Sequence, residues 1–156
     1  MDGPEGRFIT LLAEIKEIMT VDYKINALIN TDQFIELLKN STLGERRPIQ
    51  DRKCMDGMIS NSNLIVSAWD SGQLIGIARS ITDFHYACYL SDLAVSENYQ
   101  KSGIGKQLQI ITQKQLGPEC KLILIAAPAA NKYYQHIGFT NNPRCWILER
   151  GACINS

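Results

Sequence analysis

The sequence predicts one α/β domain built on a mixed sheet. Two apolar runs flank Asp70-Ser71-Gly72-Gln73, and the Ser-Gly step supplies the tight turn that joins antiparallel strands. Further along, a strand pattern at residues 86–95, a helical pattern at 103–116 and a second strand pattern at 121–127 follow one another. Strand, helix and strand in this order predict a right-handed crossover between parallel strands. The expected fold class is therefore α/β (α+β mixed sheet), with antiparallel strands first and a parallel crossover later.

The first predicted element is an amphipathic helix at residues 8–19, where apolar side chains recur at helical spacing between charges. Met19 is an alternative start, so residues 1–20 are treated as an N-terminal extension or helix. The rest of the chain, residues 21–156, is expected to form a single domain because it shows no repeat, low-complexity tract or linker.

The next segment predicts one strand and two helices. The strand is expected at residues 23–28. Asn30-Thr31-Asp32 then offers N-cap side chains to a helix whose apolar residues follow at helical spacing. A glycine and a proline within residues 41–48 end that helix, and a further helix is expected at 51–59.

The remaining elements are recognised by apolar runs for strands and by three- and four-residue spacing for helices. In chain order they are strands at 64–69, 74–78 and 86–95, a helix at 103–116, a strand at 121–127, a helix at 129–136 and a strand at 145–149. Gly117-Pro118 and Gly138 end the last two helices. The uninterrupted run at 121–127 is typical of a parallel strand that is covered on both faces.

Composition excludes several classes of protein. The 156 residues include 16 Lys+Arg and 16 Asp+Glu, so no overall positive field draws the chain to nucleic acid or to an anionic membrane. The longest apolar stretch, residues 122–130, is far shorter than the roughly 20 residues of a membrane-spanning helix. Neither nucleic acid nor membrane is therefore expected as a partner.

Cysteine usage indicates a reducing compartment. The five cysteines are odd in number and widely spaced, and none forms a Cys-x-x-Cys pair. Asp2 and Glu5 stand where a secretion signal carries positive charge. These observations predict a cytoplasmic protein with free thiols and no metal site.

The segment from Gln100 to Lys106 reads Gln100-Lys101-Ser102-Gly103-Ile104-Gly105-Lys106, between a predicted strand and a predicted helix. A glycine-bearing turn there leaves backbone N–H groups pointing outward at the positive end of the helix dipole, which favours an anion. Two nucleotide-binding motifs fail by counting. A P-loop needs a glycine where Gln100 stands, and a Rossmann fingerprint needs one at Leu108.

Gln100-x-x-Gly103-x-Gly105 resembles the pyrophosphate-binding signature of the GNAT superfamily, the acyl-CoA-dependent N-acyltransferases. Residues 127–139, which contain Tyr133-Tyr134 four residues before Gly138-Phe139, resemble a second block of that family. Residues 69–95 further resemble its small bacterial and plastid members. The resemblance implies a GNAT-like fold with splayed strands, acetyl-CoA as cosubstrate, and direct acetyl transfer in a ternary complex. The acceptor it implies is a primary amine of a small molecule or peptide.

The same resemblance implies the residues that bind the cofactor. The strand of Leu93, Ala94 and Val95 would splay from its neighbour and pair its backbone with the pantetheine arm. The pyrophosphate would be held around the turn, by Gln100, Lys101, Ser102, Gly103, Ile104, Gly105 and Lys106. Asn131 matches a position that contacts the cofactor arm.

Tyr134 and Asp92 are the predicted catalytic residues. Tyr134 aligns with the family's general acid, and a phenol suits that role because it is protonated at neutral pH. Strand alternation places Asp92 on the same face as Leu90 and Ala94, where a carboxylate needs a partner or a function. Asp92 is therefore either the group that takes or relays the amine proton, through water if needed, or a structural acceptor for backbone or arginine donors.

Three further alternatives stay open at the level of sequence. The charged segment Glu45-Arg46-Arg47 either selects an acidic group on the acceptor or is a solvated loop. The protein is either an enzyme or a non-catalytic acetyl-CoA-binding sensor, and a toxin that acetylates aminoacyl-tRNA is disfavoured by the zero net charge. The sequence leaves a homodimer open and does not identify the amine.

Overall fold

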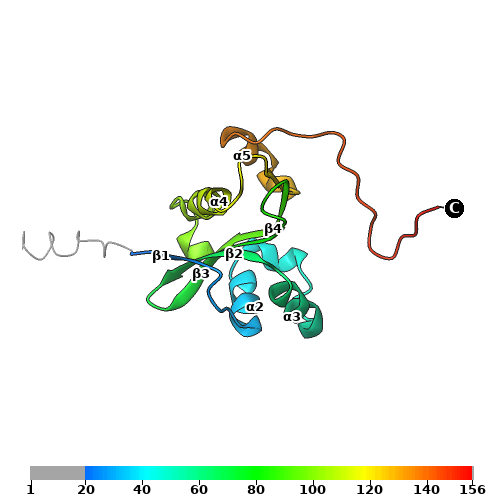
Figure 1. Ribbon diagram of the computed structural model, residues 1–156. Coiled ribbons are helices and arrows are strands. Elements are labelled where there is room, and N and C mark those ends of the chain that lie inside the picture. The colour runs from blue at the N-terminus through cyan, green and yellow to red at the C-terminus, as the bar shows by residue number, and fades with distance from the viewer. Residues whose placement is uncertain (1–19, 156) are drawn as a thin grey trace, which may run out of the picture. The chain divides into compact units, whose positions relative to one another are not determined.

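The computed structural model describes residues 20–155 (Figure 1). The helix expected at 8–19, and all but the last residue of the extension expected at 1–20, lie outside the described residues. The chain divides into two compact units, Met1–Leu124 and Ile125–Ser156. The single domain expected over residues 21–156 stays a prediction.

The first unit is built on a five-stranded sheet in the order β1-β2-β3-β4-β5. The strands are β1 (Asp22–Ile25), β2 (Leu64–Asp70), β3 (Gln73–Thr82), β4 (Ala87–Val95) and β5 (Lys121–Ile123). Neighbours from β1 to β4 pair antiparallel, and β4 pairs parallel with β5. The mixed sheet that the sequence predicts is confirmed.

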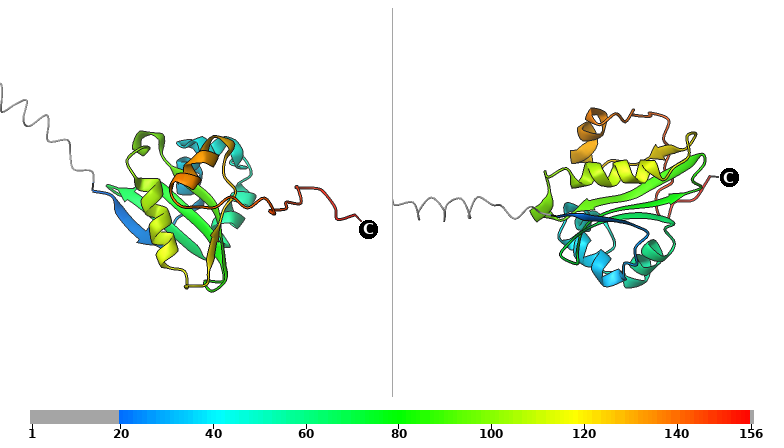
Figure 2. Two further views of the ribbon diagram at one scale, coloured as in Figure 1. Left: turned by 90° about the horizontal axis from the view of Figure 1, so that it is seen from above. Right: turned by 60° about the vertical axis from the view of Figure 1, so that its left-hand side comes forward.

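Helices cover both faces of this sheet (Figure 2, right). On one face lie α2 (Thr31–Lys39), the 3-10 helix η1 (Thr42–Arg46) and α3 (Arg52–Ser60), and on the other lies α4 (Ile104–Lys114). A short 3-10 helix, η2 (Glu97–Tyr99), follows β4 on the way to α4. None of the helices within residues 20–155 is long and apolar enough to cross a membrane.

α2 begins at the cap that the sequence predicts. The side chain of Asn30 accepts a hydrogen bond from the backbone N–H of Gln33 at 2.8 Å, and the side chain of Gln33 accepts one from the N–H of Asn30 at 3.0 Å. This reciprocal capping box satisfies two donors that a helix start otherwise leaves free. It fixes the helix that leads into η1.

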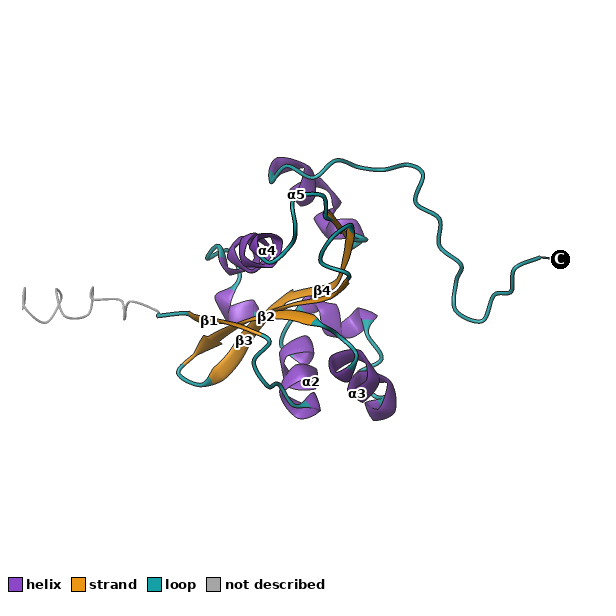
Figure 3. Ribbon diagram, in the orientation of Figure 1, coloured by secondary structure: helices purple, strands orange, loops and turns teal. Residues whose placement is uncertain are grey.

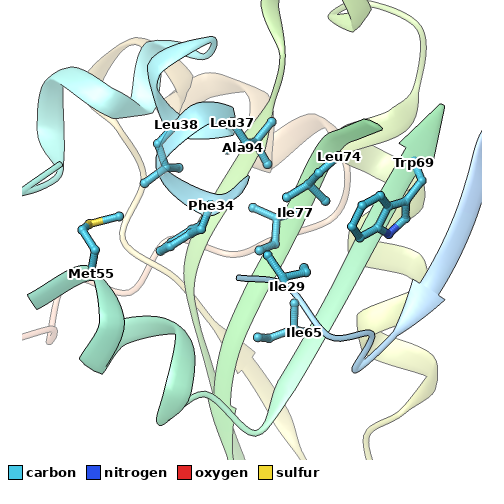
Figure 4. Close-up of a cluster of buried hydrophobic side chains, with 10 residues drawn as sticks. All are labelled: Ile29, Phe34, Leu37, Leu38, Met55, Ile65, Trp69, Leu74, Ile77 and Ala94. Carbon is cyan, nitrogen blue, oxygen red and sulfur yellow. The ribbon is translucent and has the colours of Figure 1, made fainter. Parts of the chain in front are cut away.

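The core of the first unit fills the space on both sides of the sheet. Between the sheet and the helices α2 and α3 lies the cluster of ten buried side chains in Figure 4. Its members are Ile29, Phe34, Leu37, Leu38, Met55, Ile65, Trp69, Leu74, Ile77 and Ala94. Phe34, Leu37 and Leu38 share one face of α2 because three- and four-residue spacing brings side chains onto one side of a helix. Ile104 and Leu108 of α4 pack in the same way on the opposite face of the sheet.

β4 carries a bulge at Ser91. Arg79 of β3 pairs with Asp92. The next β3 residue, Ser80, pairs with Leu90, so Ser91 has no partner on β3. Leu90 therefore packs in the cluster beneath α4, whereas Asp92 faces the α2–α3 side. The expectation that Leu90 and Asp92 share a face is wrong, because strict alternation does not hold across a bulge.

The second unit contains the 3-10 helix η3 (Pro128–Ala130) and α5 (Asn131–His136). The helix expected at 129–136 is confirmed in α5, but the strand expected at 145–149 is absent, and Figure 3 shows that segment as loop. β-propensity makes no strand without a neighbour that completes the ladder of hydrogen bonds. For the same reason β5 ends at Ile123, short of the expected residue 127.

Candidate functional site

β4 has a free edge over its C-terminal half. Its parallel pairing with β5 begins at Ala87 and ends where Tyr89 meets Ile123, whereas β4 itself continues to Val95. Among residues 20–155 no other strand pairs with β4 on this side. The ladder between the two strands thus ends at Tyr89, because β5 itself ends at Ile123.

The register of the sheet decides which backbone groups reach this free edge. Ser96 donates its N–H to the carbonyl of Ile75 at 2.9 Å. In an antiparallel ladder the bonded residues alternate, so the backbone groups of Ala94 point to β3 and those of Leu93 and Val95 point to the free edge. Of the three residues expected to meet a cofactor arm, Leu93 and Val95 can offer backbone groups there.

The loop between η2 and α4 has the conformation of an anion-binding turn. Lys101 has φ +60° and Gly103 has φ +85°, which lie in the left-handed region that glycine adopts without strain. The N–H groups of Lys101 through Lys106 find no acceptor within residues 20–155. No acidic side chain stands in the first turn of α4. An anion placed there would meet free N–H donors and the positive end of the helix dipole.

Hydrogen bonds tie this loop to its surroundings. Gln100 donates its side-chain Nε2–H to the carbonyl of Val95 at 3.0 Å, so the loop folds back onto the end of β4. The hydroxyl of Ser102 donates to the carbonyl of Tyr99. The Tyr99 hydroxyl donates to Oδ2 of Asp70 at 2.7 Å, and this hydrogen bond raises the pKa of the Tyr99 phenol. The start of the turn is therefore tied to the ends of β2 and β4.

Asp92 lies in a buried double ion pair. Its side chain is 0% exposed; Oδ1 accepts from Nε of Arg47 at 2.6 Å, and Oδ2 accepts from Nε of Arg79 at 2.5 Å. These contacts match the second of the two roles expected for Asp92, that of a structural acceptor for arginine donors. Each oxygen of the carboxylate thus accepts from a different arginine.

Arg79 is a site residue that sequence reasoning missed. Besides Asp92, its guanidinium contacts the carbonyl of Met58 and the hydroxyl groups of Ser62 and Ser91, at 2.8–3.2 Å. The signal in the sequence is a single arginine within the apolar run of β3. A buried arginine there requires a carboxylate nearby.

Cys88 is buried, which disfavours the reactive thiolate form of its side chain. Its side chain is 0% exposed on β4, and burial raises the pKa of its thiol. A thiol in that state is a poor nucleophile. Within the part of the chain that the structure describes, no three His, Cys, Asp or Glu side chains are placed to hold a metal ion.

Tyr134 and Asn131 belong to α5 of the second unit. The Tyr134 ring packs edge-on against Phe139 at 5.5 Å and against Tyr133 at 5.4 Å. Burial raises the pKa of the Tyr134 phenol above 10.0, and the neighbouring Tyr133 adds to the rise. Asn131 is exposed at the first position of the helix.

Known proteins resemble the chain in sequence. The family profile described as "Acetyltransferase (GNAT) domain" matches residues 41–145. A relative described as "Uncharacterized N-acetyltransferase ycf52", from Gracilaria tenuistipitata var. liui, is 29% identical over 129 residues. That alignment covers 81% of this chain and 70% of the relative.

Solved structures share the fold. A probable acetyltransferase of unknown function from meticillin-resistant Staphylococcus aureus gives a TM-score of 0.69 at 22% identity, over 83% of this chain and 100% of that chain. The aminoglycoside N-acetyltransferase AAC(6')-Iy, solved in complex with CoA, gives a TM-score of 0.66 at 16% identity, over 88% and 99%. At these identities the likeness concerns the fold alone.

Proposed function

Because the chain belongs to the GNAT acetyltransferase family, we propose that it transfers an acetyl group from acetyl-CoA to a primary amine of a small molecule or peptide, directly and within a ternary complex. Acetyl-CoA supplies the acetyl group as an activated thioester. The residues of the chain bind this cosubstrate, orient the amine and handle two protons.

The observation that carries the proposal is the continuity between the free edge of β4 and the turn before α4. Leu93 offers its backbone N–H and carbonyl to an extended ligand, as an exposed sheet edge does for a peptide. Val95 offers its N–H, since its carbonyl already accepts from Gln100. The unpartnered N–H groups from Lys101 to Lys106 lie where that edge ends. A long ligand with amides along its arm and a pyrophosphate at its end fits both features. Because the net charge is zero, these local groups must hold the anion.

A neutral amine nucleophile requires proton removal. A primary amine has a pKa of about 10.4, so at neutral pH only roughly one molecule in a thousand or so is the free base. The departing thiolate, whose conjugate thiol has a pKa of about 8.5, in turn gains from a proton donor. The active site must therefore take one proton and supply another.

We assign the general acid to Tyr134. Its raised pKa keeps the phenol protonated at neutral pH, and two ring contacts hold it on α5. Asn131, one turn earlier on the same helix, is proposed from the family resemblance to contact the cofactor arm.

We assign Asp92 a positioning role rather than that of the base. Both of its oxygens accept from guanidinium groups, and its side chain is 0% exposed. The carboxylate holds Arg47, and with it the end of η1, against the bulge of β4. The amine proton would then leave through water.

An acetyl-CoA-dependent thiol-release assay tests the proposal. We expect release of CoA thiol that depends on an added amine, with arylalkylamines, polyamines, amino acids and peptides as the acceptor panel. Tight CoA binding without turnover of any acceptor would contradict catalysis and would favour a sensor.

The five cysteines have no disulfide partner, which supports the further proposal of a cytoplasmic location.

A further inference from the structure

The ion pair around Asp92 carries an excess of positive charge. Arg47 and Arg79 both pair with this carboxylate, and neither forms another ion pair within residues 20–155. The side chain of Arg79 is 5% exposed and that of Asp92 is 0% exposed, while that of Arg47 is 22% exposed. A buried cluster with one net positive charge is costly unless an anion compensates it. Because the side chain of Arg47 is partly exposed, such an anion can reach its guanidinium from solvent.

The hydrogen-bond donors point to the same residue. A guanidinium has five N–H donors. Those of Arg79 reach Asp92, Met58, Ser62 and Ser91 through four hydrogen bonds. Arg47 makes three, to a carboxylate oxygen of Asp92 and to the backbone carbonyls of Arg46 and Ser91. Two N–H donors of Arg47, one on Nη1 and one on Nη2, therefore have no acceptor within residues 20–155 and are available to a carboxylate.

The position of Arg47 relates this donor pair to the reaction. Its Nη2 group donates to the carbonyl of Ser91 at 2.8 Å. Ser91 is the bulge residue and lies two residues after Tyr89, where the pairing of β4 with β5 ends. A cofactor arm that follows Val95 and Leu93 from the pyrophosphate turn runs toward this point. The reacting end of the cosubstrate would therefore lie beside Arg47.

We propose that Arg47 binds a carboxylate of the acceptor, so that the substrates are amines that also carry a carboxylate, such as amino acids and acidic peptides. This inference rests on the proposed acetyl transfer. A monoanionic carboxylate balances the single excess charge, whereas a phosphate dianion would overcompensate it. Asp92 keeps Arg47 in place but cannot neutralise both guanidinium groups.

Paired acceptors test this inference in the unmodified protein. Linear amino acids with one to four methylene groups between amine and carboxylate are compared with their carboxamides. The quantity compared is kcat/KM, calculated from the concentration of the unprotonated amine. We expect at least one chain length at which the acid is preferred about tenfold or more, since charge-assisted bidentate hydrogen bonds are about twice as strong as neutral ones. Equal values for acid and amide at every length would overturn the inference while leaving acetyl transfer intact. The absence of turnover with any amine would overturn both.

Two variants connect the preference to Arg47. Arg47→Gln should reduce the ratio of acid to amide to about one, and Arg47→Lys, which keeps the charge but loses the fork, should leave an intermediate ratio. The control is Arg46→Gln, because Arg46 is exposed and its side chain makes no ion pair within residues 20–155. The readout is a ratio, so a general loss of folded protein does not change it. An unchanged ratio in Arg47→Lys and Arg47→Gln would overturn the assignment.

Discussion

The Nε group of Arg47 donates to Oδ1 of Asp92 at 2.6 Å, across 45 positions of sequence. This bond joins the C-cap of η1 to the strand that carries the free edge. Because Arg79 occupies the other carboxylate oxygen at 2.5 Å, Asp92 has no oxygen free of arginine. Through these two bonds the Asp92 carboxylate fixes both the end of η1 and the bulge of β4.

Asp92→Asn should lower the free energy of unfolding by about 3–5 kcal/mol, because it removes the carboxylate that two guanidinium groups share in a buried site. The matched control is Asp22→Asn, which breaks the exposed 3.4 Å pair with Lys24 and should cost about 0–1 kcal/mol. Urea-induced unfolding measures both. If Asp92→Asn unfolded like the wild type while turnover collapsed, Asp92 would be the base and not a positioning residue.

Gly103→Ala should weaken acetyl-CoA binding by roughly tenfold and destabilise the fold by about 1–2 kcal/mol, because the φ of +85° is unfavourable for a residue with a Cβ. A Cβ at Gly103 would meet no atom within 4 Å, so the effect comes from the backbone and not from a clash. Calorimetric titration with CoA measures the affinity.

The control for this variant is Gly57→Ala. Gly57 lies inside α3, and a Cβ there would also meet no atom within 4 Å. We expect Gly57→Ala to stabilise the protein by about 0.5–1 kcal/mol, since alanine favours a helix interior, and to leave CoA binding unchanged. If Gly103→Ala and Gly57→Ala bound CoA with equal affinity, the turn at residues 101–106 would not be the pyrophosphate site.

Much of the first unit could be predicted because its signals are local. The Ser71-Gly72 turn, the Asn30 cap and the glycine at position 103 each act within a few residues of chain. The apolar side chains of α2 likewise follow a spacing that is visible in the sequence. Such features do not depend on which distant segment lies beside them.

The remaining features depend on pairing between distant segments. The bulge at Ser91 is a property of the register between β3 and β4, and neither strand shows it alone. The bond between Arg79 and Asp92 follows from the same register. Residues 145–149 have the composition of a strand but no ladder partner among the described residues, and composition does not supply one.

Asp83 should give the protein an acid-sensitive turn. The pKa of its carboxyl is lowered to about 2, because the carboxylate accepts three backbone hydrogen bonds. The donors are the N–H groups of Tyr86, Ala87 and His85. An unfolded aspartate has a pKa of about 3.9, so this stabilisation is complete above that pH and is lost as the pH falls toward 2.

Asp83→Asn keeps an acceptor oxygen but does not titrate. We therefore expect the stability difference between wild type and Asp83→Asn to shrink as the pH falls from about 4 toward 2. Thermal unfolding across this pH range measures the difference. A difference that stays constant would show that Asp83 does not carry the effect.

Tyr134→Phe should lower kcat by about a hundredfold or more, because a positioned general acid contributes at least that factor, and should leave CoA affinity unchanged. Tyr133→Phe removes the neighbouring hydroxyl and should retain most of the activity. Both substitutions keep the ring contacts. Equal rates for the two variants would remove the assignment of Tyr134 as the acid.

The most direct test of acetyl transfer follows the acetyl group itself. Acetyl-CoA that carries an isotope label in its acetyl group is incubated with the full chain and an amine, and the products are analysed by mass spectrometry. We predict that the label appears on the amine nitrogen in the same amount as CoA thiol is released, and that no label remains on the protein, since transfer is direct. Two results would contradict direct transfer: an amine that stays unlabelled while labelled acetate is released, or label that is retained on the protein.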